Sequence, residues 1–158
     1  MTDYTYTEVP DQVRSILQSV ADEINTLPKF KKHAFVLIDD DDMTKVKKQS
    51  VSPVIAVMYG GLFATGQNSG QNTGARTTGS LVEIDVQVFV IGDVSLLCEK
   101  PTNNADFQML PTLHDIREHL RSKQLGCQLW RFGGEQPQEI SGIYGYMQNW
   151  RGTFFLFK

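Results

Sequence analysis

The chain has 158 residues, of which 41% are hydrophobic, 15 are Lys or Arg and 18 are Asp or Glu, giving a net charge of −3. This length favours a single domain that can bury a hydrophobic core, and the recurring apolar segments exclude disorder for most of the chain. The slightly acidic balance argues against a dedicated nucleic-acid-binding protein, because such proteins normally carry a basic surface.

The first predicted element is an amphipathic helix over residues 10–27. Its hydrophobic residues are spaced as on one face of a helix with 3.6 residues per turn: Val13, Ile16, Leu17, Val20, Ile24 and Leu27. Pro28 is expected to end the helix. A stripe of this kind needs an apolar surface to cover, so a sheet or a second helix must lie beneath it.

Three strands are predicted next, over residues 33–38, 53–59 and 81–91. The first two are short, continuously apolar runs, which are typical of strands covered on both faces. In the third, aliphatic residues alternate with Glu83, Asp85 and Gln87, which therefore share the opposite face. Phe89 and Ile91 indicate that the second half of this strand is covered on both faces.

The last third of the chain predicts a helix and more strands. The helix is indicated by Leu110, Leu113, Ile116 and Leu120, with Gly126 as its C-terminal stop. A strand over 126–132 and a turn over 133–137 follow. Residues 143–157 are rich in aromatic side chains and predict one or two strands, broken near Asn149 or Gly152.

These elements follow the order α-β-β-β-α-β-β. The strands outnumber the helices and do not alternate regularly with them, which favours an α+β fold over a doubly wound one. We therefore expect one domain over residues 1–158, with an antiparallel or mixed sheet and both amphipathic helices packed on one face.

The segment Thr65–Ser80 joins two predicted strands and carries almost no charged or apolar side chain, Ala75 and Arg76 excepted. It lies in a stretch where six glycines fall between Gly60 and Gly79. No Lys follows a Gly as a phosphate-binding loop requires, and a strand rather than a helix comes next. Two interpretations stay open: a flexible hairpin loop, or a loop that becomes ordered against another subunit.

No residue pattern indicates catalysis or a metal site. The run Asp39–Asp42 lacks the spacing and the glycine of a calcium-binding loop, and Lys45, Lys47 and Lys48 can balance its charge. His114 and His119 are five residues apart and cannot chelate as an i, i+4 pair does, and His33 stands alone. Cys98 and Cys127 form no zinc or redox motif, so both are expected to be reduced thiols.

Targeting signals are not expected either. The N-terminal residues have neither the basic region nor the apolar core of a signal peptide, and no apolar run approaches the roughly 20 residues that a membrane span needs. Aromatic residues concentrate in the last thirty positions. Most of them are expected in the core, and some at a subunit interface, where Trp, Tyr and Arg are enriched.

The arrangement resembles the tail-terminator proteins of tailed bacteriophages, especially the Mu-like group that also occurs in prophages and contractile injection systems. The resemblance covers most of the chain. It consists of the order of the elements and of the residue patterns within them, at residues 13–17, 81–90, 110–120, 143–147 and 152–157. It implies a small α+β subunit that forms a six-fold ring on the head-proximal end of the tail tube. The ring stops polymerisation of the tube and joins the tail to the neck.

The resemblance further implies a structural protein with no enzymatic activity and no cofactor. Its partners would be further copies of itself, the tail tube protein, the head–tail connector or neck protein and the tail sheath, without membrane or sequence-specific nucleic acid. It would lie in the tail or neck of the virion after assembly in the bacterial cytoplasm. We expect the following residues at the subunit or tube interface: Asn68, Gln71, Asn72, Arg76, Glu83, Asp85, Trp150 and Arg151.

Two other functions stay open at the level of sequence. The first is another neck, tail-completion or minor tail protein. The second, from a different class, is a small cytosolic α+β enzyme or ligand-binding domain that uses residues 65–80 as a lid. An enzyme would have a cleft with converging ionisable groups, whereas an assembly subunit would have extended contact surfaces.

Overall fold

A computed structural model describes residues 8–37, 53–65, 79–91 and 109–157. In chain order these form α1 (Glu8–Asn25), the short 3-10 helix η1 (Pro28–Phe30), β1 (Ala34–Leu37), β2 (Val54–Ala64), β3 (Gly79–Ile91), α4 (Met109–Arg121), β4 (Gln128–Ile140) and β5 (Ile143–Phe157). Over the described residues, the predicted order of helices and strands is confirmed.

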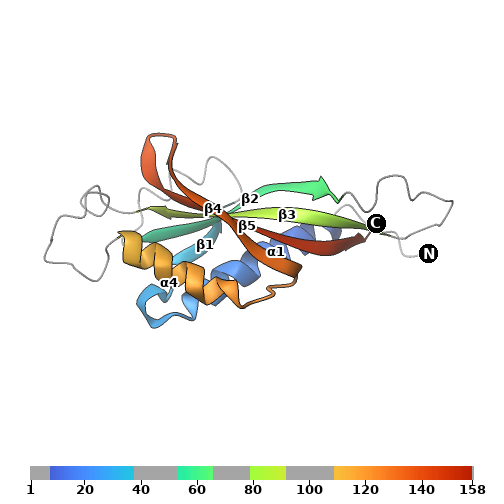
Figure 1. The fold of residues 1–158 in the computed structure, drawn as a ribbon, viewed down its shortest axis with the longest axis horizontal. Coiled ribbons are helices and arrows are strands. Elements are labelled where there is room, and N and C mark those ends of the chain that lie inside the picture. Colours follow the sequence, from blue (N-terminus) through green and yellow to red (C-terminus); the bar gives the residue numbers. More distant parts are fainter. Residues whose placement is uncertain (1–7, 38–52, 66–78, 92–108, 158) are drawn as a thin grey trace, which may run out of the picture.

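The strands form one five-stranded mixed sheet in the order β1-β2-β3-β5-β4 (Figure 1). β1 pairs in parallel with β2, whereas the pairs β2–β3, β3–β5 and β4–β5 are antiparallel. Both helices lie on the same face of the sheet, as predicted, and the protein has an α+β fold. The opposite face is called the second face below.

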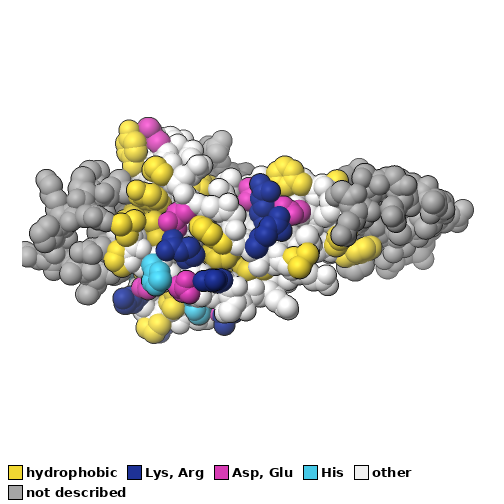
Figure 2. Space-filling view, viewed as in Figure 1, with side chains coloured by type: hydrophobic (Ala, Val, Ile, Leu, Met, Phe, Trp, Pro, Cys, Tyr) yellow, Lys and Arg dark blue, Asp and Glu magenta, His cyan; other side chains and the backbone are white. Residues whose placement is uncertain are grey.

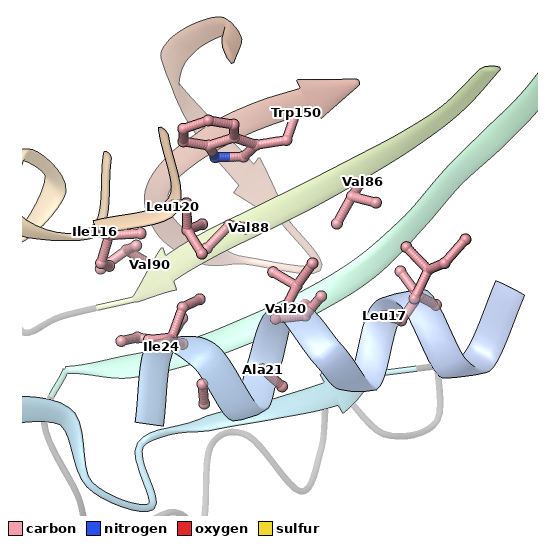
Figure 3. Close-up of a cluster of buried hydrophobic side chains, with 14 of the residues drawn as sticks. Leu17, Val20, Ala21, Ile24, Val86, Val88, Val90, Ile116, Leu120 and Trp150 are labelled. Atoms are coloured by element: carbon pink, nitrogen blue, oxygen red, sulfur yellow. The ribbon is translucent and has the colours of Figure 1, made fainter. Parts of the chain in front are cut away.

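The predicted stripe of α1 forms the centre of the main hydrophobic core. Ile16, Leu17, Val20, Ala21 and Ile24 are buried there against alternate residues of β2 and β3. Figure 3 shows the side chains of α1 pointing at the sheet, while Ile116 and Leu120 approach from α4. The alternation predicted for β3 is confirmed, because its aliphatic residues Val82, Ile84, Val86, Val88 and Val90 all belong to this core.

A side-chain clasp fixes the end of α1 to the sheet. The amide of Asn25 donates to the carbonyl of Ala34 and accepts from its backbone N–H, both at 2.9 Å. The amide thus replaces a neighbouring strand for the first residue of β1. The helix ends two residues before the predicted boundary, and Leu27 packs against the core from the turn that follows.

A smaller cluster lies on the second face at one end of the sheet. Its buried members come from four strands: Leu37, Val54, Ala56, Phe89, Ile91, Ile143 and Met147. This confirms that the second half of β3 is covered on both faces. The carboxylates of Glu83 and Asp85 lie on the same second face, nearer the start of β3.

Two predictions about the C-terminal third were wrong. Residues 133–137 are not a turn, because β4 runs through them and the chain reverses at Ser141 and Gly142 instead. β4 is an edge strand that tolerates Pro137, and shifts in its pairing near Gly133 and Gly134 absorb the two glycines. β5 is one unbroken strand of 15 residues, in which Asn149 and Gly152 are both paired with β3.

The second helix also differs in detail. Leu110, expected in the core, is half exposed, and the neighbouring Met109 is buried in its place. α4 ends at Arg121, so Gly126 does not cap it; with φ +81° it lies in the turn that leads to β4. Among the described residues, no helix has the length and hydropathy needed to cross a membrane.

Candidate interaction surface

The predicted interface residues Glu83, Asp85 and Arg151 meet on the second face of the sheet. β3 and β5 pair so that Asp85 lies opposite Arg151 and Glu83 lies opposite Thr153. Cross-strand neighbours of an antiparallel pair point to the same side, and the core residues of β3 point to the other. The register thus gathers charged side chains from two strands at one place.

β4 adds a second arginine to this place. The guanidinium of Arg131 donates to one carboxylate oxygen of Glu83 at 3.0 Å, and that of Arg151 donates to the other at 3.3 Å. Glu83 is mostly buried, whereas the Arg131 and Arg151 side chains are 51% and 46% exposed. Such exposed ion pairs contribute little stability, but they hold two guanidiniums side by side with N–H groups left for a partner.

Asp85 lies beneath this pair and is 9% exposed. Gly60 makes room for it, since a Cβ at position 60 would lie 2.5 Å from the Asp85 Oδ2 atom. The pairing of β2 with β3 shifts between Tyr59 and Gly61, so the two glycines form a bulge next to the carboxylate. The other oxygen, Oδ1, is buried and has no hydrogen-bond partner among the residues that the structure describes.

Burial raises the pKa of Asp85 above its usual value. Arg151 opposes this shift, the nearby carboxylate of Glu83 adds to it, and a hydrogen bond from Gln87 again lowers the pKa. The folded protein therefore binds the Asp85 proton more tightly than the unfolded chain does. Ionisation of Asp85 costs the folded state free energy.

We expect Asp85→Asn to stabilise the protein by on the order of 1 kcal/mol at neutral pH, because it removes a buried charge with an unpaired oxygen. In the wild type, the Asp85 contribution to the free energy of unfolding should fall as the pH rises from the ordinary Asp pKa through the raised one, since the folded state then holds more protons. Urea unfolding at a series of pH values measures both effects.

The matched control is Glu139→Gln, which removes an exposed carboxylate from β4. It should leave both the stability and its pH dependence nearly unchanged. A wild type and an Asp85→Asn variant with parallel pH profiles would show that Asp85 titrates as it does in the unfolded chain.

Exposed hydrophobic side chains accompany the charged ones. Phe63 of β2 is 49% exposed and lies opposite Glu83, and the guanidinium carbon of Arg151 is 6.0 Å from the centre of its ring. Phe155 of β5 is also exposed. Figure 2 shows basic side chains gathered beside acidic ones, with exposed hydrophobic side chains near them. Arginine and aromatic residues together are typical of protein interfaces.

Trp150 was wrongly expected at an interface. It points to the helix-bearing face, is completely buried, and stacks on Trp130 with ring centres 5.6 Å apart. The four other predicted residues, Asn68, Gln71, Asn72 and Arg76, lie outside the described residues, as does the segment 66–78 to which they belong; Gly79 and Ser80 already belong to β3.

Sequence reasoning missed Arg131 and Phe63. Their residue types were visible, but only the register of β4, β5, β3 and β2 brings them to Glu83. The alternation of polar residues in 81–91 was the available signal, since it marked one face of β3 as unsuited to the core.

In the described part of the chain, His33 and His119 lie close to backbone carbonyl oxygens and Cys127 is buried. The His33 Nδ1 atom is 2.8 Å from the Pro53 carbonyl oxygen, and the His119 Nε2 atom is 3.0 Å from the Glu23 carbonyl oxygen. Cys127 is a free buried thiol, and burial raises its pKa to about 11. Cys98 and Asp39–Asp42 lie outside the described residues. Within the described ranges, no three His, Cys, Asp or Glu side chains are grouped so as to hold a metal.

A scan against models of protein families found no match to this chain, and a search of curated proteins found no match either.

Proposed function

We propose that this protein is a phage tail terminator: a structural subunit that assembles into a ring, caps the head-proximal end of the tail tube, stops its polymerisation and joins the tail to the neck. The proposal begins from the resemblance in element order described above. The α+β fold, with two helices on one face of a mixed sheet, supports it at the level of architecture.

The observation that carries the proposal is the surface on the second face. Two adjacent guanidiniums share one carboxylate beside an exposed phenylalanine, over a tightly paired set of strands. This arrangement suits a flat protein–protein contact, because the rigid strands hold the side chains in place before a partner arrives. A subunit that acts through contact surfaces needs such a patch.

The test is a capping assay with the tail tube protein encoded in the same genome. Tube protein is polymerised with and without this protein, and tube lengths and ends are examined by negative-stain electron microscopy. We expect shorter tubes with an annular cap at one end. The double variant Arg131→Ala/Arg151→Ala should cap less well, whereas Arg14→Ala, which removes an exposed arginine of α1, should cap like the wild type. Tubes of unchanged length and bare ends would refute the proposal.

A further inference from the structure

Leu129 of β4 is a large apolar residue at an exposed position, and folding explains its backbone conformation but not its residue type. Its φ is +50°, a region that a leucine rarely adopts, and its side chain is 75% exposed. The pairing of β4 with β5 shifts between Gln128 and Arg131, and the next residue, Trp130, stacks on the buried Trp150. The bulge thus allows Trp130 to stack on Trp150. Glycine or asparagine would adopt this φ more easily than leucine and would expose no apolar surface.

A groove elsewhere on the same chain has the shape and lining to take such a side chain. It lies between the turn with η1 and the outer face of α4 and has a volume of about 550 Å³. Leu27 and Pro28 contribute apolar surface above the buried Phe30. The polar lining consists of Lys29 and, from α4, Asp115, Glu118 and His119. The volume exceeds that of a leucine side chain, so neighbouring groups can enter with it.

The groove is slightly acidic, because two carboxylates and one ammonium line it, whereas the residue near Leu129 that could reach it is basic. Arg131 lies two residues beyond Leu129 and keeps N–H groups that its bond to Glu83 does not use. The groove offers the carboxylates of Asp115 and Glu118, whose own ion pairs with Lys29 at 3.6 Å and Arg121 at 3.4 Å are exposed and therefore weak. A guanidinium that arrives beside the leucine can bind these carboxylates.

We infer that Leu129 and Arg131 of one copy dock into the η1–α4 groove of a second copy. This inference rests on the ring-forming function proposed above and names the contact that would build the ring. Leu129 is on an edge strand and the groove is on the helix layer, so each copy uses two different surfaces. Such head-to-tail contacts generate a closed ring when the rotation between neighbours closes.

The first test compares self-association of the wild type and Leu129→Asn by analytical ultracentrifugation. Asparagine tolerates a positive φ, so the variant should fold with unchanged or higher thermal stability, which thermal melting checks. Its self-association should be at least tenfold weaker, because a buried anchor is lost. Leu110→Gln is the control: it removes another exposed leucine, from the first turn of α4, and should associate like the wild type.

The second test exchanges charges. Arg131→Glu and Glu118→Arg should each weaken self-association, and the two substitutions in one chain should restore it, because every contact then pairs an arginine with a glutamate again. Restoration by the double variant separates a direct contact from a general loss of stability.

The inference is overturned if Leu129→Asn associates like the wild type, if the charge exchange does not restore association, or if the wild type stays monomeric up to about 1 mM. Its failure is distinguishable from failure of the proposed function. If wild type and Leu129→Asn cap tail tubes equally well, the docking contact is wrong and the function stands. If Leu129 drives self-association but the wild type leaves the tubes uncapped, the function is wrong and the contact stands.

Discussion

Trp150→Ala should lower the free energy of unfolding by about 3–5 kcal/mol, the usual cost of truncating a large buried aromatic side chain. Trp150 is fully buried at the centre of β5. Its ring stacks almost in parallel on Trp130, meets Phe132 edge-on with centres 5.2 Å apart, and packs within the core that both helices cover. The substitution removes these contacts together and leaves a cavity in a closely packed region.

Urea unfolding followed by circular dichroism measures this loss. The control is Tyr144→Ala on the same strand, where the side chain is more than half exposed, and its effect should stay within about 0.5 kcal/mol. If Trp150→Ala instead retained full stability and lost only self-association, Trp150 would be an interface residue as its type suggested, and the burial described here would be wrong.

The sequence predicts best those elements in which hydrophobic residues recur at a regular spacing along one face. The stripe of α1 has a helical period that admits one interpretation, and the alternation in β3 separates Val82, Ile84 and Val86 from Glu83 and Asp85 without knowledge of the partner strands. For both elements the hydrophobic pattern alone decides which side faces the core.

The prediction failed where local turn chemistry and tertiary pairing disagree. Gly133, Gly134 and Pro137 form a strong turn signal, yet β4 continues through them because it is an edge strand that needs hydrogen bonds on one side only. The positive φ of Leu129 could not be foreseen either, because it follows from the stacking of Trp130 on a residue twenty positions away.

The candidate site shows the same limit. The sequence marked Glu83, Asp85 and Arg151, but the convergence of Arg131 on Glu83 depends on two strand registers, which no local pattern determines. Trp150 was misplaced because its residue type is as common at interfaces as in cores. In β5, Gln148 and Tyr144 lie on the same face as Trp150, and one is a buried polar residue while the other is exposed. The sequence of β5 therefore does not indicate which face points to the core.

Gln148 is a polar residue in the core that joins α4 to the sheet. It is fully buried, and its amide nitrogen donates to the Leu113 carbonyl of α4 and to the Glu135 carboxylate of β4, both at 2.9 Å. Its amide oxygen accepts from the indole N–H of Trp150 at 3.2 Å. Arg117 of α4 binds the same Glu135 oxygen at 2.7 Å. Gln148 therefore satisfies groups on three elements at once.

Gln148→Met should lower the free energy of unfolding by about 2 kcal/mol, because methionine fills a similar volume but leaves the Trp150 N–H buried without its partner. The Leu113 carbonyl loses the bond from Gln148 but keeps the backbone bond that it accepts within α4. Glu135 keeps its bond to Arg117 and loses less. Gln136→Met, a matched change at an exposed position of β4, should have little effect.

Hydrogen exchange should show where the Gln148→Met variant is destabilised. The amides of α4 should lose protection before those of β3 and β5, since α4 loses its polar link to the sheet. If α4 exchanged only together with the sheet, and Gln148→Met were as stable as the wild type, hydrophobic packing of Leu113, Ile116 and Leu120 alone would hold the helix in place.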